Sequence, residues 1–284
     1  MSSLLRHHGS HVTYVYRGYF LDDHKAILDG IRFSKTARVD IVKALADGRY
    51  ATRTRTLVTP NIYHMKLAAD SDAFRDALND ADYVVADGWP VALALGLVSG
   101  ESSSRIAGVD LAIDVLTRAA IAGARISVVG GSPDANRAAR VEVARRWPKL
   151  ELVGRDAAPL LSSEISERST RMFAEVLNSG EPDIVLLCFG APKSEAYLYR
   201  ARQDVHVGSV LCVGATVDFL AGTKKRAPEF VQRLGIEWLY RLLQEPRRLW
   251  KRYTTSGAAF IRIVARVAVT RLRRGRSSAS RSGK

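Results

Sequence analysis

The sequence predicts an α/β protein in which a parallel β-sheet is flanked by helices. Three observations lead to this prediction. Short runs rich in β-branched residues alternate with longer amphipathic segments, these segments are long enough to cross between parallel strands, and Gly, Pro or small polar residues follow most of the short runs. The alternation is typical of a Rossmann-like sheet, whose ligands bind outside the carboxyl ends of the strands.

The expected strands are short and apolar, and they cover residues 56–61, 82–86, 125–129, 150–153, 183–189 and 207–213. The expected helices lie between them, over residues 63–79, 108–122, 134–146, 164–178 and 193–203. We also expect a strand near residues 26–33 and a helix over residues 38–47 to open the domain.

The surplus positive charge lies at the C-terminal end of the chain. Residues 1–223 contain 26 Lys and Arg against 26 Asp and Glu, whereas residues 224–284 contain 17 against 3. A cationic end of this kind is attracted to anionic lipid surfaces and to polyphosphates. The pattern predicts four regions: an N-terminal extension over 1–24, a Rossmann-like catalytic domain over 25–223, a basic helical appendage over 224–274 and a disordered tail over 275–284.

The overall composition, 47% hydrophobic and 25% charged, is that of an ordinary folded enzyme. The sequence shows neither a signal-peptide apolar run nor the roughly 18 uninterrupted apolar residues of a membrane span. We therefore expect the body of the protein in the cytoplasm. Cys188 and Cys212 lie within apolar runs, so we expect two reduced, buried thiols and no metal site.

The best candidate for a phosphate-binding loop is Gly130-Gly131-Ser132-Pro133, which joins a predicted strand to a predicted helix. Glycines let a ligand approach the backbone, and the N-terminus of the next helix offers free N–H groups to a phosphate. The same residues also form ordinary strand-to-helix turns. Similar loops follow other strands, at Thr59-Pro60-Asn61, Asp87-Gly88-Trp89-Pro90, Gly190-Ala191-Pro192-Lys193 and Gly214-Ala215-Thr216.

Asp87 is the carboxylate best placed for chemistry, because it directly follows the apolar run from Tyr83 to Ala86. At the mouth of the crevice it can accept a proton. An equally good interpretation is that Asp87 caps a helix that begins near Pro90. Asp218 is a weaker candidate, because Phe219 and Leu220 beside it favour a structural role. No Asp-x-Asp pair or His-rich cluster follows a strand, so a metal site is not expected.

A long stretch of the sequence resembles the WecG/TagA/CpsF glycosyltransferase family. The motif runs from Val213-Gly214-Ala215-Thr216-Val217-Asp218-Phe219 through Lys225-Arg226-Ala227-Pro228 to Glu237-Trp238-Leu239-Tyr240-Arg241 and Gln244-Glu245-Pro246-Arg247-Arg248. Further matches are Thr59, Asn61, Ala86-Asp87-Gly88, Arg105, Gly108-Val109-Asp110-Leu111, Gly130-Gly131-Ser132-Pro133 and Gly190-Ala191-Pro192-Lys193 before Glu195. The resemblance covers residues 25–253 in the correct order, and residues 1–24 match no motif.

The resemblance implies an inverting transfer of a sugar from a UDP-sugar to a sugar linked to polyprenyl diphosphate, in the synthesis of cell-surface polymers. The sugar is of the N-acetylmannosamine type or its uronic acid, and neither a metal nor another cofactor is implied. The resemblance makes Asp87 the general base. It places the donor and acceptor in contact with Thr59, Asn61, Arg105, Gly130, Gly131, Lys193, Ser194, Glu195 and Gly214, and it makes Arg241, Arg248 and Lys251 candidates for binding the diphosphate. Ser194 departs from the family, which usually has Gln there.

The segment from Ala258 to Arg274 has the pattern of an interfacial helix. At 100° per residue, Arg262, Arg266 and Arg273 form a basic stripe beside a broad apolar face. Such a helix lies in the headgroup region of a membrane, which predicts an enzyme peripheral to the inner face of the plasma membrane and bound to its anionic surface.

Two other classes of protein are less consistent with the sequence. A Rossmann oxidoreductase needs a Gly-x-Gly-x-x-Gly turn after its first strand, and none occurs there. A nucleic-acid-binding protein would explain the basic end but not the polar residues after the strands, so we expect no nucleic acid partner. The sequence leaves open which sugar and which acceptor are used, and whether the chain forms a homo-oligomer.

Overall fold

The computed structural model describes residues 25–99, 105–155, 164–228, 230–231 and 237–247, and, further on, residues 250, 254–255, 257, 260–263, 265 and 267. For residues 238 and 241 it describes only the backbone. The predicted N-terminal extension over 1–24 and the predicted disordered tail over 275–284 lie outside the described residues.

A six-stranded parallel sheet forms the centre of the protein, which confirms the predicted fold class. Its strand order is β4-β3-β8-β7-β5-β6. The strands are β3 (Arg55–Val58), β4 (Tyr83–Val84), β5 (Arg125–Gly130), β6 (Glu151–Leu152), β7 (Ile184–Cys188) and β8 (Ser209–Cys212). All five residues of β7 are buried, as expected for a strand covered on both faces.

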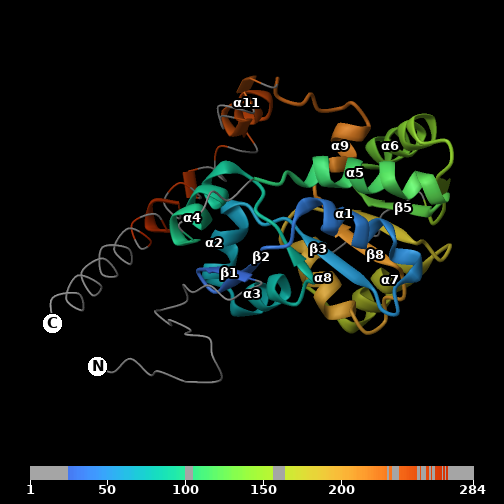
Figure 1. Ribbon diagram of the computed structural model, residues 1–284, viewed down its shortest axis with the longest axis horizontal. Coiled ribbons are helices and arrows are strands. Elements are labelled where there is room, and N and C mark those ends of the chain that lie inside the picture. Colours follow the sequence, from blue (N-terminus) through green and yellow to red (C-terminus); the bar gives the residue numbers. More distant parts are fainter. Residues whose placement is uncertain are drawn as a thin grey trace.

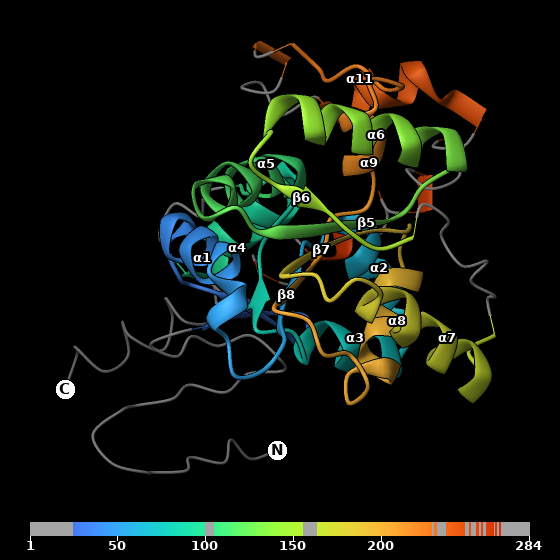
Figure 2. The same cartoon turned by 90° about the vertical axis from the view of Figure 1, so that its right-hand side faces the viewer.

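Helices cover both faces of the sheet (Figures 1 and 2). One apolar cluster joins the sheet to α2 (Ile62–Asp70), α3 (Asp72–Asn79), α4 (Trp89–Ser99), α7 (Glu167–Asn178) and α8 (Lys193–Ala201). A second cluster joins the other face to α1 (Arg38–Ala46), α5 (Gly108–Ala119), α6 (Pro133–Arg146) and α9 (Thr216–Leu220). Two short 3₁₀ helices, η1 (Gly48–Tyr50) and η2 (Ala120–Ala122), follow α1 and α5. Successive residues of β7 alternate between the two clusters, so the sheet contributes to both.

The start of the domain differs from the prediction of one strand near residues 26–33. The structure has two antiparallel strands instead, β1 (Lys25–Leu28) and β2 (Ile31–Ser34), which form a separate two-stranded sheet. Asp29 and Gly30 between them have φ angles of 48° and 80°. Positive φ at both central residues is the geometry of a two-residue hairpin turn, for which Asp-Gly is a preferred sequence. The prediction of one strand was wrong because the chain reverses at Asp29-Gly30 within the predicted run.

The helix predicted over residues 63–79 is two helices, α2 and α3, with a break at Ser71. The backbone of Ser71 is extended, with φ −146°, and its side chain accepts a hydrogen bond from the Phe74 N–H. Ser is a strong N-cap residue, so a new helix begins after it. The apolar periodicity continues across the break, which explains why the sequence predicted one helix.

Beyond residue 228 the described part of the C-terminal region is largely helical, and α11 (Glu237–Gln244) is the longest helix there that is described without a gap. Ile263 and Val267 are each 1% exposed and belong to the same apolar cluster as α4. The Phe260 ring packs edge-on against Trp89 of α4, with 5.2 Å between ring centroids. Part of the apolar face that the sequence assigned to the membrane interface therefore packs against the body.

The outward side of this segment carries Ile261 and Arg262, both exposed. Arg266 and Arg273, the other members of the predicted basic stripe, lie outside the described residues. None of the described helices combines the length and the hydropathy that a bilayer span requires.

Candidate active site

A cavity of about 700 Å³ lies at the carboxyl edge of the sheet. It is lined by residues that follow five of the six strands, β3, β4, β5, β7 and β8, together with the start of α5 and the segment after α9. This position is where a Rossmann-like sheet binds its ligands. Of the residues that the sequence singled out, the cavity brings together Thr59, Asn61, Asp87, Arg105, Gly131, Lys193, Glu195 and Gly214.

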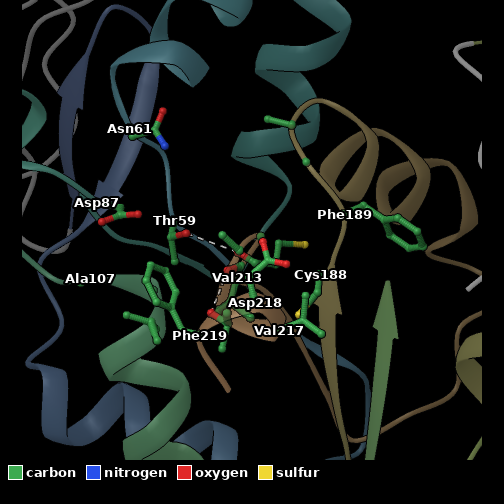
Figure 3. A pocket seen from close by; sticks show the side chains of 18 of the residues that line it. Thr59, Asn61, Asp87, Ala107, Cys188, Phe189, Val213, Val217, Asp218 and Phe219 are labelled. Carbon is green, nitrogen blue, oxygen red and sulfur yellow. Dashed lines mark hydrogen bonds between the residues drawn. The ribbon is translucent and has the colours of Figure 1, made fainter. Parts of the chain in front are cut away.

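Asp87 lies at the carboxyl end of β4, where the backbone holds it on both sides. Its N–H donates to the Pro60 carbonyl at 2.9 Å, and the preceding carbonyl of Ala86 accepts from the Ile106 N–H at 3.0 Å. The carboxylate is half-buried and lines the cavity. Figure 3 shows Asp87, Thr59 and Asn61 on one side of the cavity and Phe189 on the other. The helix that the sequence predicted near Pro90 is α4, which begins at Trp89.

Thr59 and Asn61 extend the end of β3 into the cavity. The Thr59 hydroxyl donates to the Cys212 carbonyl at 3.3 Å, which ties the end of β3 to the end of β8. Asn61 is the N-cap of α2, and its side-chain oxygen accepts from the Tyr63 N–H at 3.0 Å. Both side chains are therefore positioned by hydrogen bonds to backbone groups.

Only part of the glycine loop after β5 lines the cavity. Gly131 and Ser132 line the cavity at the N-terminus of α6, where the Ser132 hydroxyl accepts from the Ala135 N–H at 3.2 Å. Gly130 is not among the lining residues. It has φ 109°, and a Cβ there would lie 2.7 Å from the Cys188 carbonyl carbon. Gly130 is thus required for close approach of β5 to the end of β7, whereas the sequence placed it in contact with ligand.

The loop after β7 likewise lines the cavity with only some of its residues. Lys193 and Glu195 line the cavity, but Ser194 is 1% exposed, and its hydroxyl donates to the Phe189 carbonyl at 3.1 Å. Ser194 is not among the lining residues, so in this structure it supports the loop.

Three ion pairs join the segment after α9 to the cavity entrance, and none of them was foreseen from the sequence. Arg226 forms a bidentate pair with Asp110 of α5, Lys224 pairs with Asp218 at 2.5 Å, and Arg105 pairs with Glu237 of α11 at 2.5 Å. Asp110, Glu237 and Asp87 raise the pKa of Arg226, with the Asp110 hydrogen bond the largest cause. Arg226 therefore carries its charge close to Asp87.

The two cysteines are free and buried, as the sequence predicted, and both line the cavity. Burial raises the pKa of the Cys188 thiol to about 12. Burial, and then the charge of Glu195, raises the pKa of the Cys212 thiol. Both are therefore neutral thiols at physiological pH. In the described part of the chain, no three His, Cys, Asp or Glu side chains come together in a way that could hold a metal ion.

The side chains that the resemblance made candidates for binding the diphosphate are outside the described part of the protein. The side chain of Arg241 and all of Arg248 and Lys251 lie outside the described residues. The cations that line the described cavity are Arg105, Lys193, Lys224, Lys225 and Arg226. Lys224, Lys225 and Arg226 stand at the start of the basic region, and Lys225 and Arg226 also belong to the motif that carries the family resemblance, so both signals could have indicated them.

A parallel α/β sheet with a polar, cation-rich cavity at its carboxyl edge is typical of enzymes that bind phosphorylated ligands. The family model of the WecG/TagA/CpsF glycosyltransferases matches residues 9–274, and the chain belongs to this family. The match begins within the predicted N-terminal extension and ends with the predicted appendage. The protein is accordingly a glycosyltransferase of cell-surface polysaccharide synthesis, and it acts on a sugar donor and an acceptor.

Proposed function

We propose that the protein is an inverting glycosyltransferase that moves a sugar from a UDP-sugar to a sugar linked to polyprenyl diphosphate. The sugar is of the N-acetylmannosamine type or a related hexose or uronic acid, and the reaction requires no metal. The observation that carries the proposal is the presence of Asp87 and the Gly131-Ser132 turn in one cavity, together with five cationic side chains.

Asp87 serves as the general base. The acceptor hydroxyl must lose its proton as it attacks the anomeric carbon, and a carboxylate within about 3 Å of that oxygen can accept it. The half-buried position of Asp87 at the cavity wall supports this role. Direct displacement by the acceptor inverts the anomeric centre.

The departing diphosphate is stabilised by a helix N-terminus and by cations. The N-terminus of α6, which follows Gly131 and Ser132, places the positive end of the helix dipole at the cavity, where it favours a phosphate. Arg105 and Lys193 lie in the same cavity, and we assign Arg241, Arg248 and Lys251 to the same task. Charged hydrogen bonds in a site shielded from water can replace a metal ion in this role.

The basic C-terminal region attaches the enzyme to the anionic inner face of the plasma membrane, where a lipid-linked acceptor is found. Its 17 Lys and Arg against 3 Asp and Glu support this assignment. Flotation with anionic liposomes tests it, and filter binding with DNA is the control. Binding to DNA without binding to liposomes would contradict the membrane assignment.

A purified assay tests the transfer reaction. The protein is incubated with a panel of UDP-sugars and a short-chain polyprenyl-diphosphate-linked sugar, with and without chelator, and UDP release and product are measured. We expect activity with one N-acetylhexosamine-type donor and no effect of chelator. Activity that chelator abolishes would contradict the metal-free mechanism.

Asp87→Asn tests the base. We expect turnover to fall by about 10²- to 10⁴-fold, the range for a lost general base, while the affinity for UDP-sugar stays nearly unchanged. Turnover at the wild-type rate would remove Asp87 from the mechanism.

A further inference from the structure

A buried pair of side chains, His64 and Glu195, lies in the cavity wall between the ends of two strands. His64 is in the first turn of α2, after β3, and Glu195 is in the first turn of α8, after β7. They are 7% and 5% exposed, and both line the cavity. His64 Nε2 lies 3.4 Å from Glu195 Oε1. Because β8 lies between β3 and β7, the pair spans the end of the central strand.

His64 is fixed on its other side by the N-terminus of α2. Its Nδ1 accepts from the backbone N–H of Asn61 at 3.3 Å and lies 3.0 Å from the Asn61 side-chain oxygen. The imidazole also stacks on Phe74, with 6.2 Å between ring centroids. A carboxylate oxygen can only accept, so in the contact with Glu195 the hydrogen lies on Nε2, which donates to Oε1. The ring therefore holds one carboxylate oxygen in a fixed position.

The second oxygen, Glu195 Oε2, is buried and has no hydrogen-bond partner in the described part of the protein. A buried carboxylate oxygen without a donor is costly, so such groups in native proteins normally have a partner. The nearby thiol of Cys212, whose pKa the Glu195 charge helps to raise, is a weak donor and supplies no positive charge. A donor brought by a ligand would satisfy this oxygen.

The place of the pair in the sheet indicates which part of the ligand it meets. Asp87 follows β4 at one side of the cavity and the Gly131 turn follows β5 toward the other, so β3, β8 and β7 lie between them. A sugar in transfer must lie between the base and the diphosphate, which is over these three strands. A phosphate would be repelled by the carboxylate, whereas a sugar hydroxyl or an amide N–H would donate to it.

We propose that Glu195 Oε2 accepts a hydrogen bond from a hydroxyl or acetamido N–H of the transferred sugar, and that His64 is the residue that positions Glu195. The assignment rests on the proposed function, and it adds a sugar-recognition subsite in which His64 has a defined part. Glu195 contacts the sugar and not the nucleotide.

Calorimetric titration of the full chain with UDP and with a UDP-N-acetylhexosamine tests the assignment. In Glu195→Gln we expect affinity for the UDP-sugar to fall by about tenfold to a hundredfold, the range for a hydrogen bond to a charged group, with UDP affinity unchanged within about twofold. His64→Leu should produce the same selective loss. His64→Gln, which keeps an N–H donor toward Glu195, should restore much of the affinity. Glu142→Gln on the outer side of α6 is the matched control and should bind both ligands as wild type does.

The outcomes separate this assignment from the proposed function. If the wild-type protein bound the UDP-sugar and Glu195→Gln bound it equally well, the subsite would be wrong and the proposed function would stand. Equal losses for UDP and the UDP-sugar would make the pair a structural support and would also overturn the subsite. A wild-type protein that bound neither ligand would overturn the proposed function itself.

Discussion

The floor of the cavity and its rim are held by different forces. The floor consists of the strand ends and the residues that follow them, where backbone hydrogen bonds and a buried core hold the chain; to it belong Thr59, Asp87, Gly131, Cys188, Glu195 and Thr216. The rim consists of Lys224, Arg226 and Glu237, which reach their partners through partly exposed ion pairs.

The difference shows which part of the site is rigid and which can respond to a ligand. Core strands and their hydrogen bonds open only with large parts of the fold, whereas partly exposed ion pairs are individually weak and weaken further with salt. The floor should therefore stay fixed while the rim exchanges partners when an anionic ligand binds. Four measurements test this contrast.

The largest expected effect is a slow rate of alkylation at the buried thiol of the floor. Because burial raises the pKa of Cys188 to about 12, we expect iodoacetamide to alkylate the folded protein at pH 8 on the order of a thousandfold more slowly than free cysteine. A thiol with a raised pKa stabilises the fold below about pH 9, and this contribution is lost as the pH rises toward 12. Mass spectrometry measures the alkylation, with urea-unfolded protein as the control. Rapid alkylation of the folded protein would show that the floor opens readily.

The next effect is on stability. In Gly130→Ala, the new Cβ would meet the Cys188 backbone at 2.7 Å, and φ 109° is strained for alanine. We expect the free energy of unfolding to fall by about 3 kcal/mol. Urea denaturation measures it. Gly190→Ala is the matched control, because a Cβ at Gly190 would have no atom within 4 Å, and it should change stability little.

We expect a smaller loss of stability when an ion pair of the rim is removed. Arg226→Ala removes the bidentate pair with Asp110, and we expect about 1–2 kcal/mol of lost stability at low salt and a smaller loss in 1 M salt. Arg145→Ala on α6 is the control, because its pair with Glu142 is exposed and its loss should change stability little. A loss for Arg226→Ala that salt leaves unchanged would contradict an electrostatic rim.

The smallest effect concerns ligand exchange at Arg105. Glu237 pairs with the guanidinium of Arg105, which we assign to the diphosphate. Because Glu237→Gln removes this competing carboxylate, it should raise the affinity for UDP by about threefold in a low-salt titration. Glu142→Gln, which removes a carboxylate whose partner Arg145 does not line the cavity, should leave UDP affinity unchanged. Weaker binding by Glu237→Gln would mean that the pair prepares Arg105 for its ligand and does not compete with it.

The same contrast explains what the sequence could predict. Strands and strand-end loops are local features, so the apolar runs and the residues after them indicated the sheet, Asp87 and most of the floor. The hairpin at Asp29-Gly30 and the cap at Ser71 are also local, and closer attention to turn and cap residues would have found both.

The rim could not be predicted in this way. Arg226 and Asp110 are 116 residues apart, and Arg105 and Glu237 are 132 apart, so each pairing depends on how the whole chain folds. His64 was missed for a different reason. It occupies the third position of a capping box at Asn61, where Glu or Gln is the usual signal, and its contact with Glu195 spans 131 residues.

The packing of Ile263 and Val267 into the core beside α4 bears on how shortened forms of the protein would behave. A chain that ended before residue 258 would leave apolar side chains of α4 without their cover and add to the exposed Trp89 and Leu93. Such a chain would tend to self-associate through the uncovered helix. Comparing intact and truncated forms would then report on aggregation as well as on attachment to lipid, and substitution of the outward Ile261 and Arg262 is the cleaner way to separate the two.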